Sequence, residues 1–126
     1  MSETSLAVAV RKGNETIVKL LLEKSADINT LNKKDRTSLS FAASRKNETV
    51  VELLLKKDAD MEIKDRSGCT PLIWAARGRN VSTVKLLLDK DADTEMKDKD
   101  GRTALDWATM LEREPIIRLL QGAQRT

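Results

Sequence analysis

The chain has 126 residues and a net charge of +3, with 40% hydrophobic and 34% charged residues. This length suits one domain with one core and is too short for two. No apolar run approaches the roughly 18 to 20 residues that span a bilayer, and the N-terminus lacks the regions of a secretory signal. Because Cys69 is the only cysteine, no internal disulfide can form, and we expect a soluble intracellular protein, cytoplasmic or nuclear.

The chain repeats itself with a period of 33 residues. In each unit a threonine is followed two residues later by a leucine, and three residues after that by an alanine. We therefore divide the chain into units of about 1–33, 34–66, 67–99 and 100–126. The four threonines are Thr4, Thr37, Thr70 and Thr103.

The first unit predicts two helices. Leu6 and Ala9 share one face of a short helix that follows Thr4, and the apolar spacing around Val18 indicates a second, longer helix that follows Asn14. Threonine and asparagine side chains can accept hydrogen bonds from the free N–H groups of a first helical turn. We therefore expect both residues to cap the helices that they precede.

The later units repeat this order. Asn47 and Asn80 precede the longer helices of the second and third units. Pro71 stands at the first position of its helix, where the missing N–H costs nothing. In the fourth unit Ile117 and Leu120 continue the apolar stripe of the longer helix. The whole chain is thus predicted to consist of paired helices.

Two segments resemble the ankyrin repeat: TPLIWAARGRNVSTVKLLLDKDAD (residues 70–93) and DGRTALDWA (residues 100–108). The resemblance covers about residues 3–121 in four copies that stay in register. It implies an all-α fold, an ankyrin-repeat solenoid of stacked helix-turn-helix units with β-turn fingers, as a single domain over residues 1–126. It also implies protein binding through the concave surface formed by the finger tips and the first helices.

The chain departs from the family pattern in two ways: it lacks the usual histidine, and other residues replace several of the usual glycines. It has no histidine, which excludes a histidine pH switch. The glycine that usually ends the first helix is kept as Gly13, and other residues replace the remaining helix-ending glycines. If these positions are left-handed, each replacement costs roughly 1 kcal/mol, so Lys46→Gly is expected to raise thermal stability. The replacements are Lys46, Arg79 and Glu112 after the first helices, and Ser25, Asp58 and Asp91 after the second.

The two ends of the predicted stack differ in polarity. Gln121 replaces a leucine in the last unit, which makes that end partly polar. The first unit is as apolar as the internal ones, so we interpret the chain as a segment of a longer array. We also expect it to self-associate through this uncapped N-terminal unit. The apolar residues in question are Leu6, Val8, Ala9, Val10 and Ile17.

Basic residues gather where the family pattern places the fingers and the ends of the first helices, whereas acidic residues gather after the second helices. This distribution predicts a positively charged inner groove. Asp65 and Asp98, at the family's acidic turn position, are expected to be hydrogen-bonded into their fingers. Trp74 and Trp107 are expected to pack along the inner helices with their rims in the groove, and the alternative is that they form a binding hot spot. The predicted partner-binding residues are Lys33, Lys34, Arg36, Arg45, Lys46, Lys64, Arg66, Trp74, Arg77, Arg79, Lys97, Lys99, Arg102 and Trp107.

Three functions remain open at this point. The chain is a protein-interaction module or scaffold whose groove binds an acidic surface or peptide, or an architectural spacer segment of a longer ankyrin array with no ligand of its own. Apart from either function, the basic side chains could serve only to maintain solubility. The third function, binding of nucleic acid or another polyanion, is disfavoured because the groove lacks interleaved aromatic residues.

Catalytic and cofactor sites are not expected. The sequence has no glycine-rich phosphate loop, no His/Cys metal set and no convergent acid–base pair. We therefore predict no enzyme activity, no cofactor, no metal and no membrane contact. Cys69 is expected to be an inert thiol, although Arg66 and Arg77 could lower its pKa.

Overall fold

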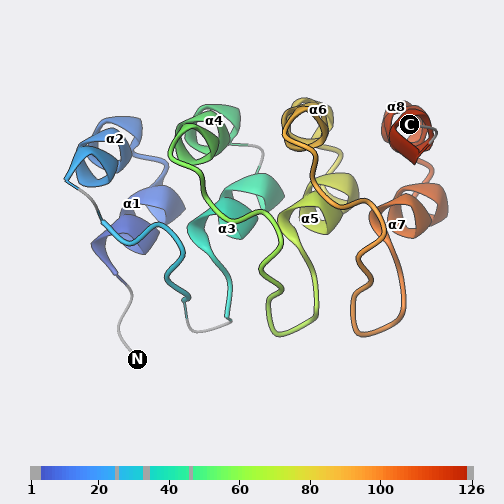
Figure 1. Cartoon of the computed structure of the whole chain (residues 1–126), viewed down its shortest axis with the longest axis horizontal. Coiled ribbons are helices and arrows are strands. Elements are labelled where there is room, and N and C mark those ends of the chain that lie inside the picture. The colour runs from blue at the N-terminus through green and yellow to red at the C-terminus, as the bar shows by residue number, and fades with distance from the viewer. Residues whose placement is uncertain (1–3, 25, 33–34, 46, 125–126) are drawn as a thin grey trace.

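The computed structural model describes residues 4–24, 26–32, 35–45 and 47–124, and within these ranges every regular element is an α-helix (Figure 1). The expected all-α fold of stacked helix-turn-helix units is confirmed. The helices are α1 (Ser5–Lys12), α2 (Glu15–Glu23), α3 (Ser38–Ser44), α4 (Glu48–Lys56), α5 (Pro71–Arg77), α6 (Val81–Asp89), α7 (Ala104–Met110) and α8 (Glu114–Gln124).

Side-chain caps fix where the helices begin. Pro71 opens α5, and the hydroxyl of Thr70 accepts a hydrogen bond from the backbone N–H of Ile73. Thr103 and Asp106 form a reciprocal capping box at the start of α7. These contacts satisfy N–H groups that have no partner inside the helix. The predicted caps at Thr4, Asn14, Thr37, Asn47, Thr70, Asn80 and Thr103 are all confirmed.

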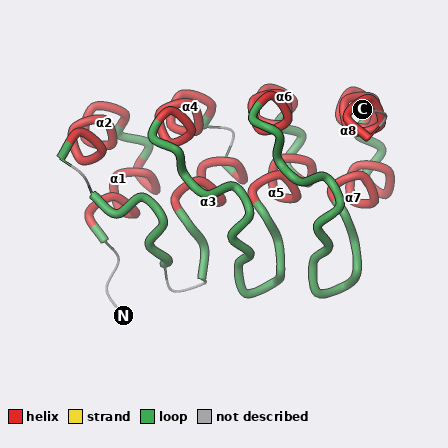
Figure 2. The backbone as a smooth tube through the Cα atoms, viewed as in Figure 1, coloured by secondary structure: helices red, strands yellow, loops and turns green. Residues whose placement is uncertain are grey.

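The helices form two tiers, from which three fingers project (Figures 1 and 2). The inner tier contains α1, α3, α5 and α7, and the outer tier contains α2, α4, α6 and α8; neighbouring helices pack within each tier and within each pair. The first finger, described at residues 26–32 and 35–36, lies between α2 and α3. The second (residues 59–69) joins α4 to α5, and the third (residues 92–102) joins α6 to α7.

The core consists of small and branched aliphatic side chains that repeat from unit to unit. Leu39 and Leu72 occupy one position in successive inner helices, and Leu54 and Leu87 occupy one position in successive outer helices. All four are buried. Because burial of a leucine side chain stabilises a fold by about 1.5 to 3 kcal/mol, repeating these positions stabilises every interface of the stack.

Left-handed residues end several helices although most of them are not glycine. Gly13, Arg79 and Glu112 have φ angles of 69°, 60° and 58° between an inner and an outer helix. Asp58 and Asp91 follow outer helices with φ angles of 60° and 63°. The left-handed geometry on which the predicted stability cost depends is present at these replaced positions. The corresponding residues Ser25 and Lys46 lie outside the described residues, so the expectation for Lys46→Gly stays a prediction.

The N-terminal end of the stack exposes apolar side chains. Ile17 is 42% exposed, whereas Val50, Thr83 and Ile116, at the same position of the later units, are at most 1% exposed. In those units the preceding helix pair covers this position. Leu20, which was not among the apolar residues predicted to be exposed at this end, is 49% exposed there. An apolar surface is therefore present at this end of the stack.

This surface is narrower than the sequence indicated. Leu6, Ala9 and Val10 are buried, and Val8 is half-buried. At the opposite end of the stack, Gln121 is exposed, as its polar character predicts.

Candidate binding surface on the inner helices and fingers

In each of the last two fingers, an aspartate side chain stabilises the turn by accepting backbone hydrogen bonds. The Oδ1 atom of Asp65 accepts hydrogen bonds from the backbone N–H groups of Ser67 (2.9 Å) and Cys69 (3.0 Å). In the third finger Asp98 accepts two bonds of the same kind, from the N–H groups two and four residues later. The expectation that both aspartates are hydrogen-bonded into their fingers is confirmed.

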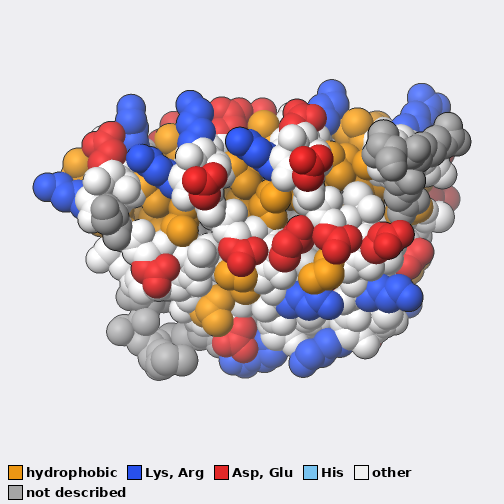
Figure 3. All heavy atoms as spheres, viewed as in Figure 1, with side chains coloured by type: hydrophobic (Ala, Val, Ile, Leu, Met, Phe, Trp, Pro, Cys, Tyr) orange, Lys and Arg blue, Asp and Glu red, His pale blue; other side chains and the backbone are white. Residues whose placement is uncertain are grey.

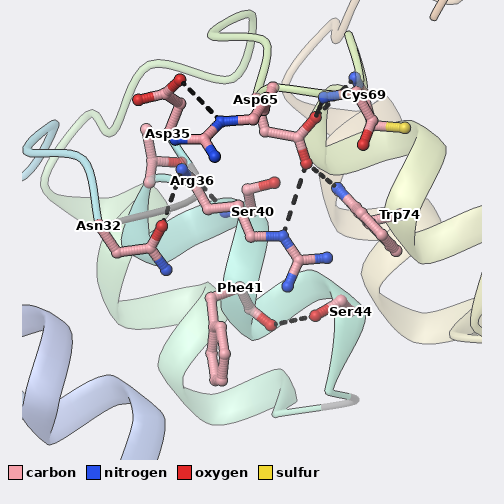
Figure 4. Close-up of polar contacts among 12 residues, drawn as sticks. Asn32, Asp35, Arg36, Ser40, Phe41, Ser44, Asp65, Cys69 and Trp74 are labelled. Atoms are coloured by element: carbon pink, nitrogen blue, oxygen red, sulfur yellow. Dashed lines mark hydrogen bonds and ion pairs between the residues drawn. The ribbon is translucent and has the colours of Figure 1, made fainter.

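The second oxygen of each aspartate holds a tryptophan. The indole Nε1 of Trp74 donates to Asp65 Oδ2 at 2.8 Å (Figure 4), and that of Trp107 donates to Asp98 Oδ2 at 2.7 Å. Burial by itself raises the pKa of Asp98, but hydrogen bonds from the backbone N–H of Arg102 and from the Trp107 indole lower this pKa below its ordinary value of 3.8. These hydrogen bonds favour the charged form of Asp98, and in each finger the aspartate side chain fixes the indole in place.

Arginine side chains lie over the indole rings. The Cζ atoms of Arg36 and Arg77 lie 3.9 Å and 4.5 Å from the centroid of the Trp74 ring. Arg77 also lies over Trp107 at 4.2 Å, and Arg102 lies over Trp107 at 5.2 Å. We call these five residues the Arg–Trp row. Since each cation–π contact contributes about 0.5 to 2 kcal/mol, the row links the first finger, α5, α7 and the third finger.

The row supports the packing role expected for the tryptophans. Both rings are half-buried, their N–H groups are bound to aspartates, and guanidinium groups lie over them. The exposed cations, rather than the rings, therefore offer the larger share of this surface to a partner.

Arg77 enters the row because the second finger has a short side chain at one repeat position. Arg36 and Arg102 occupy this position in the first and third fingers, and the residue between them in register is Cys69. The Cys69 thiol is buried and accepts a long hydrogen bond from Arg77 Nη1 at 3.7 Å. The short thiol leaves room for Arg77, which reaches the rings from the end of α5.

The surroundings of Cys69 raise its pKa rather than lower it. Burial is the largest cause, and the negative charge of Asp65 adds to it. Arg77 opposes both through its hydrogen bond and its charge, but does not outweigh them. The suggestion that nearby arginines lower this pKa is therefore corrected. Because the thiolate is the reactive form, the environment favours the inert thiol that the sequence predicted.

Three arginines of this surface already have carboxylate partners. Arg36 is the most enclosed of them, with a side chain that is only 14% exposed. Among the described residues, no carboxylate forms an ion pair with Arg77. The three ion pairs are Arg36 with Asp65 (3.5 Å), Arg66 with Asp35 (3.6 Å) and Arg102 with Asp100 (3.8 Å).

The structure places most of the predicted groove residues on two fingers and two helices. Lys64 Nζ donates to the backbone oxygen of Lys97 at 2.8 Å, which brings the second and third fingers together. Figure 3 shows lysine and arginine side chains over the fingers and a row of acidic side chains above them on the face in view. The residues on the second and third fingers, α5 and α7 are Lys64, Arg66, Trp74, Arg77, Lys97, Lys99, Arg102 and Trp107.

The other predicted groove residues lie elsewhere. Arg36 ends the first finger, and Arg45 follows α3 with its Cζ atom 5.0 Å from the Phe41 ring centroid. Arg79 lies in the turn between α5 and α6, where it lines a separate hollow of about 300 Å³ together with Pro115. This turn is at the other end of α5 from the second finger. Lys33, Lys34 and Lys46 lie outside the described residues.

Sequence reasoning missed the pairing of each aspartate with a tryptophan. A signal was present, because Asp65 precedes Trp74 by nine residues and Asp98 precedes Trp107 by the same interval. A hollow of about 320 Å³ opens beside the first of these pairs, with Arg36 and Arg66 in its lining. The aspartates thus shape the candidate surface even though their own oxygens are occupied.

Two other kinds of site are absent from the described part of the chain. No group of three or more His, Cys, Asp or Glu residues there could hold a metal ion. No helix in these ranges has the length and apolar character needed to cross a membrane.

Comparison with known families gives two overlapping matches that together cover nearly the whole chain. A family model described as ankyrin repeats in three copies matches residues 1–65 and, in a second overlapping match, residues 39–125. A search of curated proteins found no match.

Proposed function

The chain belongs to the ankyrin repeat family, and from this premise we propose that its fingers and inner helices bind a protein partner with an acidic surface or peptide. Members of the family are generally protein–protein interaction modules and are typically not enzymes. The observation that carries the proposal is the set of exposed cations on the second and third fingers, Lys64, Arg66, Lys97 and Lys99.

Two of the acidic residues among these cations oppose them only weakly. Asp65 and Asp98 are buried, and each directs one oxygen to backbone N–H groups and the other to an indole. Of the other finger carboxylates, Asp35 is ion-paired with Arg66 and Asp100 with Arg102, so the exposed Lys64, Lys97 and Lys99 supply most of the positive charge that a partner meets. Such a surface accelerates association with an acidic partner and makes the affinity depend on salt.

The tryptophans favour a protein over a nucleic acid as the partner. Binding of single strands relies on aromatic faces on which bases stack. At Trp74 and Trp107 guanidinium groups already lie over the rings, at 3.9 to 5.2 Å from the ring centroids. Base stacking would have to displace these cations.

The proposal is tested with two variants that change the charge equally. The finger variant carries Arg66→Glu, Lys97→Glu and Lys99→Glu. The control variant carries Lys19→Glu, Lys85→Glu and Arg118→Glu, which share one repeat position on the exposed side of the outer helices. Fluorescence anisotropy measures the binding of a labelled oligoglutamate peptide, an oligolysine peptide and a single-stranded oligonucleotide at several salt concentrations.

We expect the wild type and the control variant to bind oligoglutamate with an affinity that falls as salt rises. The finger variant should bind at least about tenfold more weakly, because its attraction for the peptide is reversed. Equal affinity of the two variants, or tighter binding of the oligonucleotide than of oligoglutamate by the wild type, would contradict the proposal.

A further inference from the structure

Arg77 differs from the other arginines of the Arg–Trp row in its electrostatic surroundings. Arg36 and Arg102 each have a carboxylate at ion-pair distance. The groups that contact the Arg77 guanidinium are two indole rings and the buried thiol of Cys69. Among the described residues it is thus the one cation of the row without a carboxylate counter-ion.

We infer that Arg77 receives a carboxylate of the acidic partner and is the anchor of its binding. The inference rests on the proposed function and names the residue at its centre. A guanidinium carries five N–H donors in a planar fork that matches the two oxygens of a carboxylate. The one hydrogen bond described for the Arg77 side chain goes to sulfur, which is a weak acceptor.

The neighbours of Arg77 hold it in place before a partner arrives. Its guanidinium lies 4.5 Å from the centroid of one indole and 4.2 Å from that of the other. Because hydrogen bonds to Asp65 and Asp98 fix the two indoles, the guanidinium between them has little freedom to lose on binding. Half-buried arginine and tryptophan residues at the centre of a surface are the residue types that most often dominate binding energy.

Partial burial also strengthens the expected contact. Arg77 is half-buried, so a carboxylate bound to it is partly shielded from water and salt, unlike one bound to the exposed finger cations. The finger cations attract the partner over distance, and Arg77 holds it at short range. Loss of Arg77 should therefore affect the dissociation rate more than the association rate.

Arg77→Met tests this inference and suits the fold, because Met110 occupies the same position at the end of α7. The matched control is Arg118→Met, which removes one positive charge from a side chain that is 82% exposed on α8. The affinity for labelled oligoglutamate is measured by anisotropy, and the dissociation rate by stopped flow. Thermal unfolding of each variant verifies that it is folded.

We expect Arg77→Met to weaken binding at least about tenfold, mainly through faster dissociation, and Arg118→Met to change the affinity less than about twofold. Arg77→Lys keeps the charge but loses the planar fork, so it should bind several-fold more weakly than the wild type. It also serves as the test if the methionine variant does not fold.

The outcomes separate the two proposals. If the wild type binds oligoglutamate and all Arg77 variants bind it equally well, the inference is overturned while the proposed function stands. If Arg77→Lys alone retains full affinity, recognition by the planar fork is overturned and only the charge is needed. If the wild type binds no oligoglutamate even at low salt, the proposed function fails and the inference fails with it.

Discussion

A buried polar atom without a hydrogen-bond partner lowers the stability of the stack. Thr83 on α6 is fully buried, and its hydroxyl has no hydrogen-bond partner among the described residues. The residues at the same position of the neighbouring units are Val50 and Ile116, which carry no polar atom. A buried hydroxyl that has lost its water without gaining a partner destabilises the folded state.

We predict that Thr83→Val raises the free energy of unfolding by about 1 kcal/mol, because it removes this hydroxyl at nearly unchanged volume. Urea denaturation of the two proteins measures the difference. Ser82→Ala, at the exposed neighbouring position, should leave the free energy within about 0.5 kcal/mol of the wild type. A less stable Thr83→Val variant would show that the hydroxyl is bonded in solution.

Two glycines at the same finger position differ in what surrounds them. Gly68 and Gly101 are both left-handed, with φ angles of 80° and 77°. A Cβ atom on Gly68 would meet the backbone nitrogen of Lys99 at 2.8 Å, whereas one on Gly101 would meet nothing within 4 Å. The same nitrogen donates to the Ser67 oxygen at 3.0 Å, so Gly68 permits the contact between the second and third fingers.

Gly101→Ala is expected to cost about 1 kcal/mol of stability, which is the price of a left-handed alanine. Gly68→Ala should cost clearly more, because it also pushes the two fingers apart. Chemical denaturation of both variants gives the comparison, and equal losses would show that the fingers do not pack closely in solution.

At the scale of the helix pair, the turn from an inner to an outer helix is strained where glycine has been replaced. Arg79 and Glu112 hold φ angles of 60° and 58° at the position where the first unit has Gly13. Side chains with a Cβ atom are disfavoured in this conformation, and neither residue is of the Asn or Asp type that tolerates it best.

We predict that Arg79→Gly and Glu112→Gly each raise the melting temperature. Relief of the left-handed strain raises the free energy of unfolding by up to about 1 kcal/mol, and the greater freedom of glycine in the unfolded chain offsets part of this gain. Calorimetry on the single variants and on the double variant measures the gain. Gly13→Ala is the reverse control and should lower the melting temperature. A decrease in both glycine variants would mean that these side chains make stabilising contacts.

At the scale of the whole molecule, the two ends of the stack offer different surfaces. Ile17 and Leu20 are exposed at the N-terminal end, where Ile17 lines a hollow of about 340 Å³ together with Val8 and Lys12. An exposed apolar surface of this kind promotes association of isolated molecules.

The isolated 126-residue chain is therefore predicted to self-associate as its concentration rises. Replacing Ile17 and Leu20 by lysine should shift it to the monomer, as measured by light scattering over a range of concentrations. Met110→Lys is the control, because this residue is 52% exposed in the last unit. A wild type that stays monomeric throughout would contradict the prediction.

Local rules explain why so much of the fold was predictable. Thr70, Pro71 and Asn80 set helix starts through contacts within a few residues, and the period of 33 residues sets which positions face the core. The location of the Arg79 side chain was harder to predict. The family pattern places Arg79 in the turn between the two helices of its unit, but it does not show on which face of the molecule this turn lies. Its side chain lines a hollow away from the fingers.

The sequence by itself determined the helix pairs, their caps, their apolar register and the gathering of basic residues on the fingers. These features depend on local spacing and on the fact that repeated units stack in the same way. Only the tertiary structure decided how the basic residues are used. Arg36 reaches Trp74 in the next unit, and Arg77 lies over both tryptophans because Cys69 is too short to occupy the space. Such contacts depend on where long side chains find room between neighbouring units, and a repeat period does not carry that information.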